Sequence, residues 1–174
     1  TYIHPFADEI VMAGQGTVGL EILEDEPEVD VLLVAIGGGG LIGGVSTAVK
    51  ALRSAAKVIG VEPVGAATLY ESVRAGHAIT LPEIRTGANT LAPRQSTGQN
   101  LDIIRRNVDE IVLVTDEEMR EAARWLWSEF GVAAELSGAA ALAALLTGKV
   151  QADPEQKVCA LVCGSGADGM EHKG

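Results

Sequence analysis

Short apolar runs alternate along this chain with segments whose apolar residues recur at helical spacing. The run at residues 29–36 is rich in Val, Leu and Ile and predicts a strand that is buried on both faces. Similar runs predict further strands at residues 57–62, 108–114 and 158–162. Because helical segments separate these runs, the pattern indicates βαβ units and an α/β fold of three layers around a mostly parallel sheet.

Helices are predicted at residues 18–24, 41–52, 66–75, 115–130 and 138–146. Thr115 and Glu118 have the spacing of a capping box at the start of the fourth helix. We expect Trp125 and Trp127 of that helix to pack in the core or at an interface. The last helix is almost entirely Ala and Leu, which predicts burial nearly all round. Residues 76–107 show little periodicity and predict a long irregular segment that is functional or packed by another part of the protein.

The length and the charge of the chain limit its class. We predict a single domain over residues 1–174, because this length lies in the usual range for one. With 24 acidic and 13 basic residues, the net charge of −11 disfavours nucleic acid and anionic membranes as partners. No apolar run approaches the roughly 20 residues that span a bilayer, and no signal-peptide pattern is present. Cys159 and Cys163 share a predicted strand and cannot easily pair, which favours a reduced, cytoplasmic setting.

Consecutive glycines follow the first predicted strand and lead into a helix. Gly37, Gly38, Gly39, Gly40 and Leu41 form this junction. Glycine accepts positive φ and lets a ligand approach the backbone, while free N–H groups and the helix dipole favour an anion. We therefore predict that these residues bind a phosphate group. A tight turn without a ligand is the plainer alternative, but it does not need four glycines. We expect Gly39→Val to block the ligand and leave the fold largely intact.

One interpretation of this loop is a dinucleotide site. Residues 38–43 fit the pattern G-x-G-x-x-G, and Glu62 closes the next predicted strand, where an acidic residue would bind the ribose of NAD. The chain would then be an NAD-binding module of Rossmann type. The pattern alone is weakly specific, because any glycine-dense loop satisfies it.

Five stretches of the sequence together favour another interpretation. Residues 4–21, the glycine loop at 37–44, Val61-Glu-Pro63, Glu135-Leu-Ser-Gly-Ala139 and Val162-Cys-Gly-Ser-Gly-Ala-Asp168 agree in order and approximate spacing with one family. The chain resembles the fold-type II pyridoxal 5′-phosphate (PLP) enzymes related to threonine and serine dehydratases. The resemblance covers essentially the whole chain. It implies the large, phosphate-binding domain of such an enzyme, with PLP as the cofactor.

The resemblance also implies roles for individual residues. Residues 37–41 would bind the phosphate group, and Cys163 would lie against the pyridine nitrogen. A thiol there is neutral near pH 7, which is compatible with α,β-elimination and less suited to transamination. Glu135 would either face the ring or substrate, or serve as a carboxylate at a helix N-terminus. Thr68 stands near the position where cation-binding members carry an acidic residue, so no metal site is predicted.

The stretch that carries the reactive lysine of this family is not found here. That lysine forms a Schiff base with PLP and lies in a Ser-x-Lys-x-Arg-Gly stretch, and the loop for the substrate carboxylate is also missing. The lysines present stand in no such context and are explained as surface charge: Lys50, Lys57, Lys149, Lys157 and Lys173. We therefore expect that an N-terminal part of the enzyme lies outside this sequence and that this chain alone is inactive.

The predicted activity of the intact protein follows from the resemblance. It implies a lyase that deaminates L-threonine or L-serine to a 2-oxo acid and ammonia, with a small amino acid as its substrate and a dimer as its assembly. A catalytically inactive domain that keeps the PLP fold for binding is a further alternative.

Overall fold

The computed structural model describes residues 3–170 and is built on a parallel sheet. Its strands are β1 (Val31–Ala35), β2 (Lys57–Pro63), β3 (Glu110–Val114) and β4 (Val158–Ala160). They lie in the order β3-β2-β1-β4, and every pair is parallel. The α/β prediction with a mostly parallel sheet is thereby confirmed.

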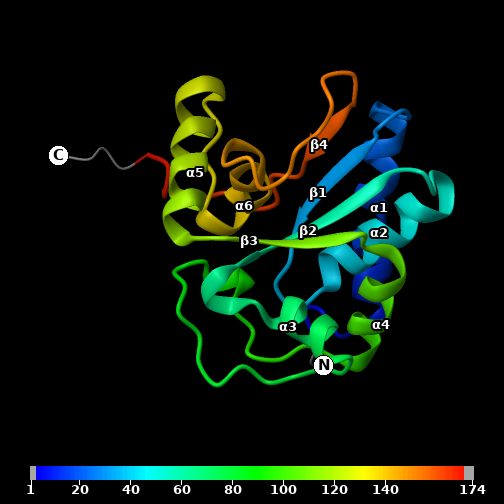
Figure 1. Cartoon of the computed structure of the whole chain (residues 1–174). Helices are drawn as coiled ribbons and strands as arrows, with labels where there is room; N and C mark the ends of the chain where they lie inside the picture. Colours follow the sequence, from blue (N-terminus) through cyan, green and yellow to red (C-terminus); the bar gives the residue numbers. More distant parts are fainter. Residues whose placement is uncertain (1–2, 171–174) are drawn as a thin grey trace.

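Helices cover both faces of this sheet, which gives three layers (Figure 1). One face carries α1 (Glu9–Asp25), α2 (Gly40–Leu52) and α4 (Gly98–Asn107), and the other carries α5 (Asp116–Phe130) and α6 (Leu136–Leu146). The side chains of β1 alternate between two cores. Leu32 and Val34 pack in the core of α2 and α4, whereas Leu33 packs in the core of α5 and α6. Burial on both faces explains the unbroken apolar run in the sequence.

Helix α1 is longer than the sequence predicted. It begins after Asp8, whose Oδ1 accepts hydrogen bonds from the amides of Ile10 and Val11 at 2.8 and 3.2 Å. The glycines that suggested an irregular lead-in instead allow close packing on α2. A Cβ on Gly19 would lie 2.9 Å from the carbonyl oxygen of Val45. The prediction of a helix starting only at residue 18 is therefore wrong.

The segment at residues 76–107 is less irregular than predicted. It contains the 3-10 turn η2 (Asn89–Leu91) and helix α4, which is capped by Thr97 through a bond from the amide of Asn100. A second 3-10 turn, η1 (Val64–Ala66), leads into α3 (Thr68–Ala75). The polar first turn of α4 hid its periodicity, because only Leu101 and Ile104 of its apolar residues are buried.

Helix α5 bears out one prediction and corrects another. Thr115 and Glu118 form the predicted capping box, with reciprocal bonds of 3.2 and 2.7 Å. Trp125 and Trp127, however, are 37% and 38% exposed, so their placement in the core was wrong. Trp125 packs edge-on against Phe130 at the end of the helix, with 5.2 Å between ring centroids. A role of the two tryptophans at an interface stays a prediction.

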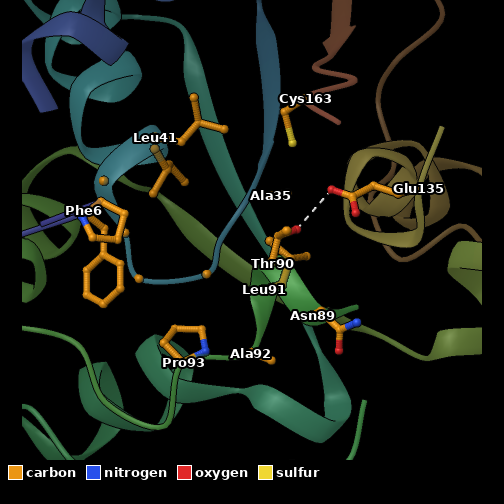
Figure 2. Close-up of a pocket in the computed structure, with 16 residues that line it drawn as sticks. Phe6, Ala35, Leu41, Asn89, Thr90, Leu91, Ala92, Pro93, Glu135 and Cys163 are labelled. Atoms are coloured by element: carbon orange, nitrogen blue, oxygen red, sulfur yellow. Dashed lines mark hydrogen bonds between the residues drawn. The ribbon is translucent and has the colours of Figure 1, made fainter. Parts of the chain in front are cut away.

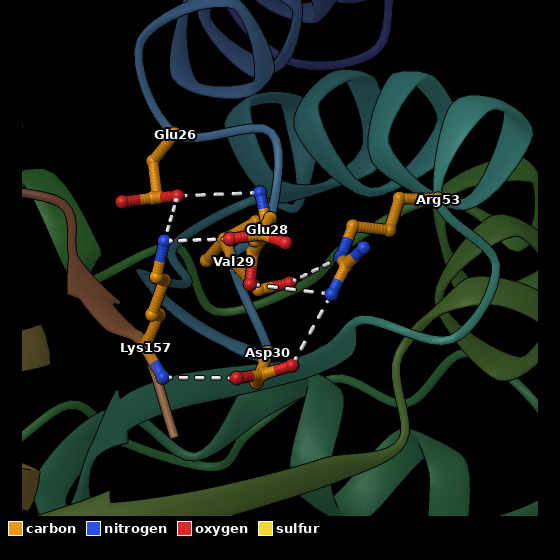
Figure 3. Close-up of polar contacts among 6 residues, drawn as sticks. All are labelled: Glu26, Glu28, Val29, Asp30, Arg53 and Lys157. Carbon is orange, nitrogen blue, oxygen red and sulfur yellow. Dashed lines mark hydrogen bonds and ion pairs between the residues drawn. The ribbon is translucent and has the colours of Figure 1, made fainter. Parts of the chain in front are cut away.

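Charged side chains tie the short edge strand β4 to its neighbour (Figure 3). Lys157 Nζ lies 2.9 Å from Glu26 and 3.0 Å from Glu28, and its amide donates to Asp30. The other oxygen of Asp30 pairs with Arg53 at the end of α2. These contacts fix the amino-terminal edge of the sheet, opposite the edge where β1 enters the glycine loop. Among residues 3–170, no helix is long and apolar enough to cross a membrane.

Candidate functional site

The glycine loop lies where β1 ends and α2 begins, with free hydrogen-bond donors. Within residues 3–170, the amides of Gly37, Gly38 and Gly39 donate to no protein acceptor. Gly39 has φ of +94° and precedes the first turn of α2, whose N-terminus carries partial positive charge. Unpaired amides at such a position are well suited to an anion.

Two buried side chains hold the carbonyl side of the same loop. The carbonyl oxygen of Gly38 accepts hydrogen bonds from Ser96 Oγ at 2.7 Å and from Asn100 Nδ2 at 2.6 Å. Asn100 Nδ2 also donates to the carbonyl oxygen of Phe6 at 2.8 Å. Sequence reasoning missed this anchor, because its donors lie far along the chain in a segment predicted to be irregular. The cap pattern at Thr97 is the one local signal that could have placed them on a helix.

Close packing is a second reason for the glycines. A Cβ on Gly38 would overlap the ring of Phe6, and a Cβ on Gly37 would lie 2.7 Å from the carbonyl oxygen of Thr90. At Gly39 a Cβ would lie 2.9 Å from Leu69 Cδ1, on a backbone that side chains rarely adopt. The expectation that Gly39→Val leaves the fold intact is therefore wrong.

A cleft of about 610 Å³ opens beside the loop (Figure 2). It is bounded by residues 37–41, by the segment 89–93, and by Glu135 and Cys163. All the residues that the sequence singled out for the cofactor therefore meet at one cleft, although they come from three distant parts of the chain. Their contact with a cofactor stays a prediction. The wall at residues 89–93 was not among the predicted site residues.

Glu135 stands at the N-cap position of α6 but does not cap that helix. Its side chain turns toward the cleft and accepts a 3.1 Å hydrogen bond from Thr90 Oγ1 (Figure 2). Asp168 supplies the missing cap, because its Oδ2 accepts a 2.8 Å bond from the amide of Leu136. Of the two alternatives left open for Glu135, the geometry favours a group that faces the cleft.

Cys163 follows β4 and lines the same cleft. Its Sγ lies 3.9 Å from the carbonyl oxygen of Ser137. Packing around the sulfur and the charge of Glu135 raise the pKa of the Cys163 thiol, so the group is neutral near pH 7. Cys159 packs half-buried against the core of α2 and α4, in agreement with a structural role.

Glu62 does not face the cleft. Its side chain is fully buried, and its two oxygens accept bonds from the amides of Leu69 and Tyr70 at 2.9 and 2.7 Å, in the first turn of α3. Burial raises the pKa of Glu62 to about 8. A ribose cannot reach a carboxyl group in this position, so the NAD interpretation is wrong.

The neighbouring Thr68 also has a local partner. Its hydroxyl donates a 2.6 Å hydrogen bond to the carbonyl oxygen of Pro93. In the part of the chain that the structure describes, no group of three or more His, Cys, Asp or Glu residues is placed to hold a metal ion.

The described lysines all lie outside the cleft. Each pairs with a carboxylate elsewhere on the surface: Lys50 with Asp109, Lys57 with Glu110, Lys149 with Glu118, and Lys157 with Glu26 and Glu28. These ion pairs agree with the prediction that they are structural surface charges. Lys173, the remaining candidate, lies outside the described residues.

Residues 1–164 match the family described as "Pyridoxal-phosphate dependent enzyme". The chain belongs to this family. An L-threonine ammonia-lyase of Thermotoga maritima is 39% identical over 165 residues, which are 95% of this chain and 40% of that protein. The match confirms the PLP family that the sequence motifs predicted.

Solved structures of PLP enzymes share the fold of this chain. A threonine deaminase from the source abbreviated T.th. superposes with a TM-score of 0.88 at 37% identity, over 94% of this chain and 60% of that one. Maize serine racemase gives a TM-score of 0.87 at 37% identity, over 95% of this chain and 52% of that one. The prediction of a fold-type II PLP domain is confirmed. The chain spans only 40% to 60% of the length of the three proteins that it matches.

The residues of the cleft fit PLP on physical grounds. The free amides of the loop suit a phosphate group, and a volume of about 610 Å³ is within the range of about 300–1,000 Å³ typical of small-molecule sites. The neutral thiol of Cys163 can lie beside a pyridine nitrogen without adding charge. The chain therefore holds the phosphate and ring elements of a PLP site.

Proposed function

We propose that the protein containing this chain is a PLP-dependent lyase that deaminates L-threonine or L-serine to a 2-oxo acid and ammonia. One observation supports this most directly: the unpaired amides of Gly37, Gly38 and Gly39 face a cleft that Glu135 and Cys163 also line. The likeness to a threonine ammonia-lyase, a threonine deaminase and a serine racemase supports the same substrate class.

The residues of the chain divide the work in this proposal. PLP, when bound, supplies an electron sink that stabilises negative charge at the α-carbon of an amino acid. Residues 37–41 bind its phosphate group through the backbone, and this fixes the position of the ring. The Cys163 thiol contacts the pyridine nitrogen and places no negative charge there, which favours elimination over transamination. Glu135, held by Thr90, offers a carboxylate beside the ring and the substrate.

The lysine that attaches PLP comes, in this proposal, from a segment outside the 174 residues. The described lysines line no part of the cleft, and the relatives are considerably longer. The present residues then form one phosphate-binding domain, and the further segment covers the open side of the cleft. Free Cys159 and Cys163 agree with a cytoplasmic setting, and a dimer is part of the same proposal.

Release of 2-oxobutyrate from L-threonine, measured with borohydride trapping, tests this function. We expect the full-length protein to turn over threonine and to yield a fixed adduct on a lysine beyond these residues. We expect the 174-residue chain with added PLP to stay at the rate of free PLP. An adduct on Lys50, Lys57, Lys149, Lys157 or Lys173 would contradict the division of roles. A full-length protein that binds PLP but releases no 2-oxo acid would support the inactive binding domain instead.

A further inference from the structure

A second groove, of about 440 Å³, lies between α3, α4 and the start of β3. It shares no lining residue with the PLP cleft. Its apolar floor includes the buried Ile104 together with Val108 and Ile111, and its polar rim is formed by Tyr70, Arg74 and Arg105. The groove thus combines an apolar surface with two cationic side chains.

The two arginines of the rim have no acidic partner. Arg74 Nη1 lies 3.4 Å from the hydroxyl of Tyr70, and its guanidinium carbon lies 5.4 Å from the centroid of that ring. Arg105 makes no hydrogen bond or ion pair with any residue from 3 to 170. Such a pair is notable in a chain whose net charge is −11.

The acidic residues that line the groove are already neutralised. Asp109 is held 2.7 Å from Lys50 and accepts a second bond from the amide of Val58. Glu110 pairs with Lys57 at 3.0 Å. Because these carboxylates are occupied by lysines, the arginines supply the uncompensated charge of the groove.

We propose that this groove binds a small organic anion that carries an apolar body. Its carboxylate or phosphate head pairs with the guanidinium groups of Arg74 and Arg105, which present several donors in a planar fork. The hydroxyl of Tyr70 is placed to add a hydrogen bond to the same head. The body covers Ile104 and Ile111, whose burial from water adds affinity that a bare inorganic ion would not gain.

Calorimetric titration of the full-length protein tests this site. PLP is kept in excess so that the glycine loop is not free for the probe. Phenyl phosphate and 3-phenylpropanoate are the probes, and comparing them shows which head group is preferred. We expect at least one to bind, with inorganic phosphate and benzyl alcohol at least tenfold weaker. Absence of binding by both probes at millimolar concentration would overturn the proposal.

Variants of the arginines assign the binding to the groove. We expect the double variant Arg74→Gln/Arg105→Gln to weaken the bound probe at least tenfold with an unchanged circular dichroism spectrum. Arg106→Gln is the matched control, because Arg106 lies on α4 but does not line the groove. Undiminished binding to the double variant, or an equal loss in Arg106→Gln, would exclude the groove. The heat of binding does not depend on turnover, so this result is independent of the proposed lyase activity.

Discussion

The hydroxyl of Thr90 donates a 3.1 Å hydrogen bond to Oε1 of Glu135, and this bond joins two walls of the PLP cleft (Figure 2). The segment that carries Thr90 is anchored outside the cleft. Asp116, at the start of α5, accepts bonds from Thr86 Oγ1 at 2.5 Å and from the amide of Gly87 at 2.6 Å. The position of Glu135 therefore depends on residues from η2 and α5 as well as on its own helix.

Thr90→Val keeps the shape of the side chain and removes the donor to Glu135. A hydrogen bond to a charged group contributes about 1.5–3 kcal/mol, so we expect kcat/KM for L-threonine to fall about tenfold or more. Thr90→Ser should restore most of it. Separate measurement of kcat, KM and PLP absorbance checks this, and an unchanged kcat/KM in Thr90→Val would refute a positioning role for Thr90.

Asn100→Leu removes the donor that holds the carbonyl oxygens of Gly38 and Phe6. Leaving buried acceptors unpaired costs about 1–3 kcal/mol, and we expect a loss of that size in the free energy of unfolding. PLP affinity should fall as well, because the glycine loop loses an anchor. Ser96→Ala should have a smaller effect, since Asn100 still donates to Gly38. Urea unfolding and PLP titration measure the two effects. A destabilised variant with unchanged PLP affinity would show that this anchor does not shape the loop.

Gly38→Ala places a methyl group where the Phe6 ring lies. We expect reduced stability and weaker PLP binding, because Phe6 must move and it also lines the cleft. Gly14→Ala is the control: a Cβ there meets no atom within 4 Å, and the site lies inside α1. That change should stabilise the protein by roughly 0.5–1 kcal/mol. Thermal unfolding of both variants tests the contrast, and a Gly38→Ala protein as stable as the parent would contradict it.

Glu62 should make stability depend on pH. Burial raises its pKa from 4.5 to about 8, against the lowering effect of bonds from the amides of Leu69 and Tyr70. Between these two values the folded state holds a proton that the unfolded state releases. The contribution is fully present below about pH 4.5 and is lost as the pH rises through about 8.

Glu62→Gln tests this pH dependence. We expect the parent protein to lose a few kcal/mol of stability between about pH 5 and pH 9, and the variant to lose less, because the amide does not ionise. Urea unfolding at several pH values measures the difference. Glu24→Gln, at an exposed position of α1, should keep the slope of the parent. Parallel pH curves for the parent and Glu62→Gln would show that Glu62 is not the titrating group.

Local patterns in the sequence determined much of the fold. The apolar run at 29–36, the glycines after it and the helix start together specify a strand, a loop and a helix, because each feature depends on residues adjacent in the chain. The same holds for the capping box of Thr115 and Glu118, whose partners are three residues apart. The motifs around Glu135 and Cys163 were sufficient to predict the PLP family.

The tertiary structure alone decided where several of these residues point. The sequence could not distinguish a Glu62 beside a ribose from one buried under α3, nor a Glu135 that caps a helix from one that meets Thr90. It also could not show that Gly19 packs on α2 or that Asn100 holds Gly38. Each of these outcomes depends on contacts between residues tens of positions apart, and such contacts leave no local periodicity. The sequence therefore determined the elements and the family, whereas the packing of distant segments decided the geometry of the site.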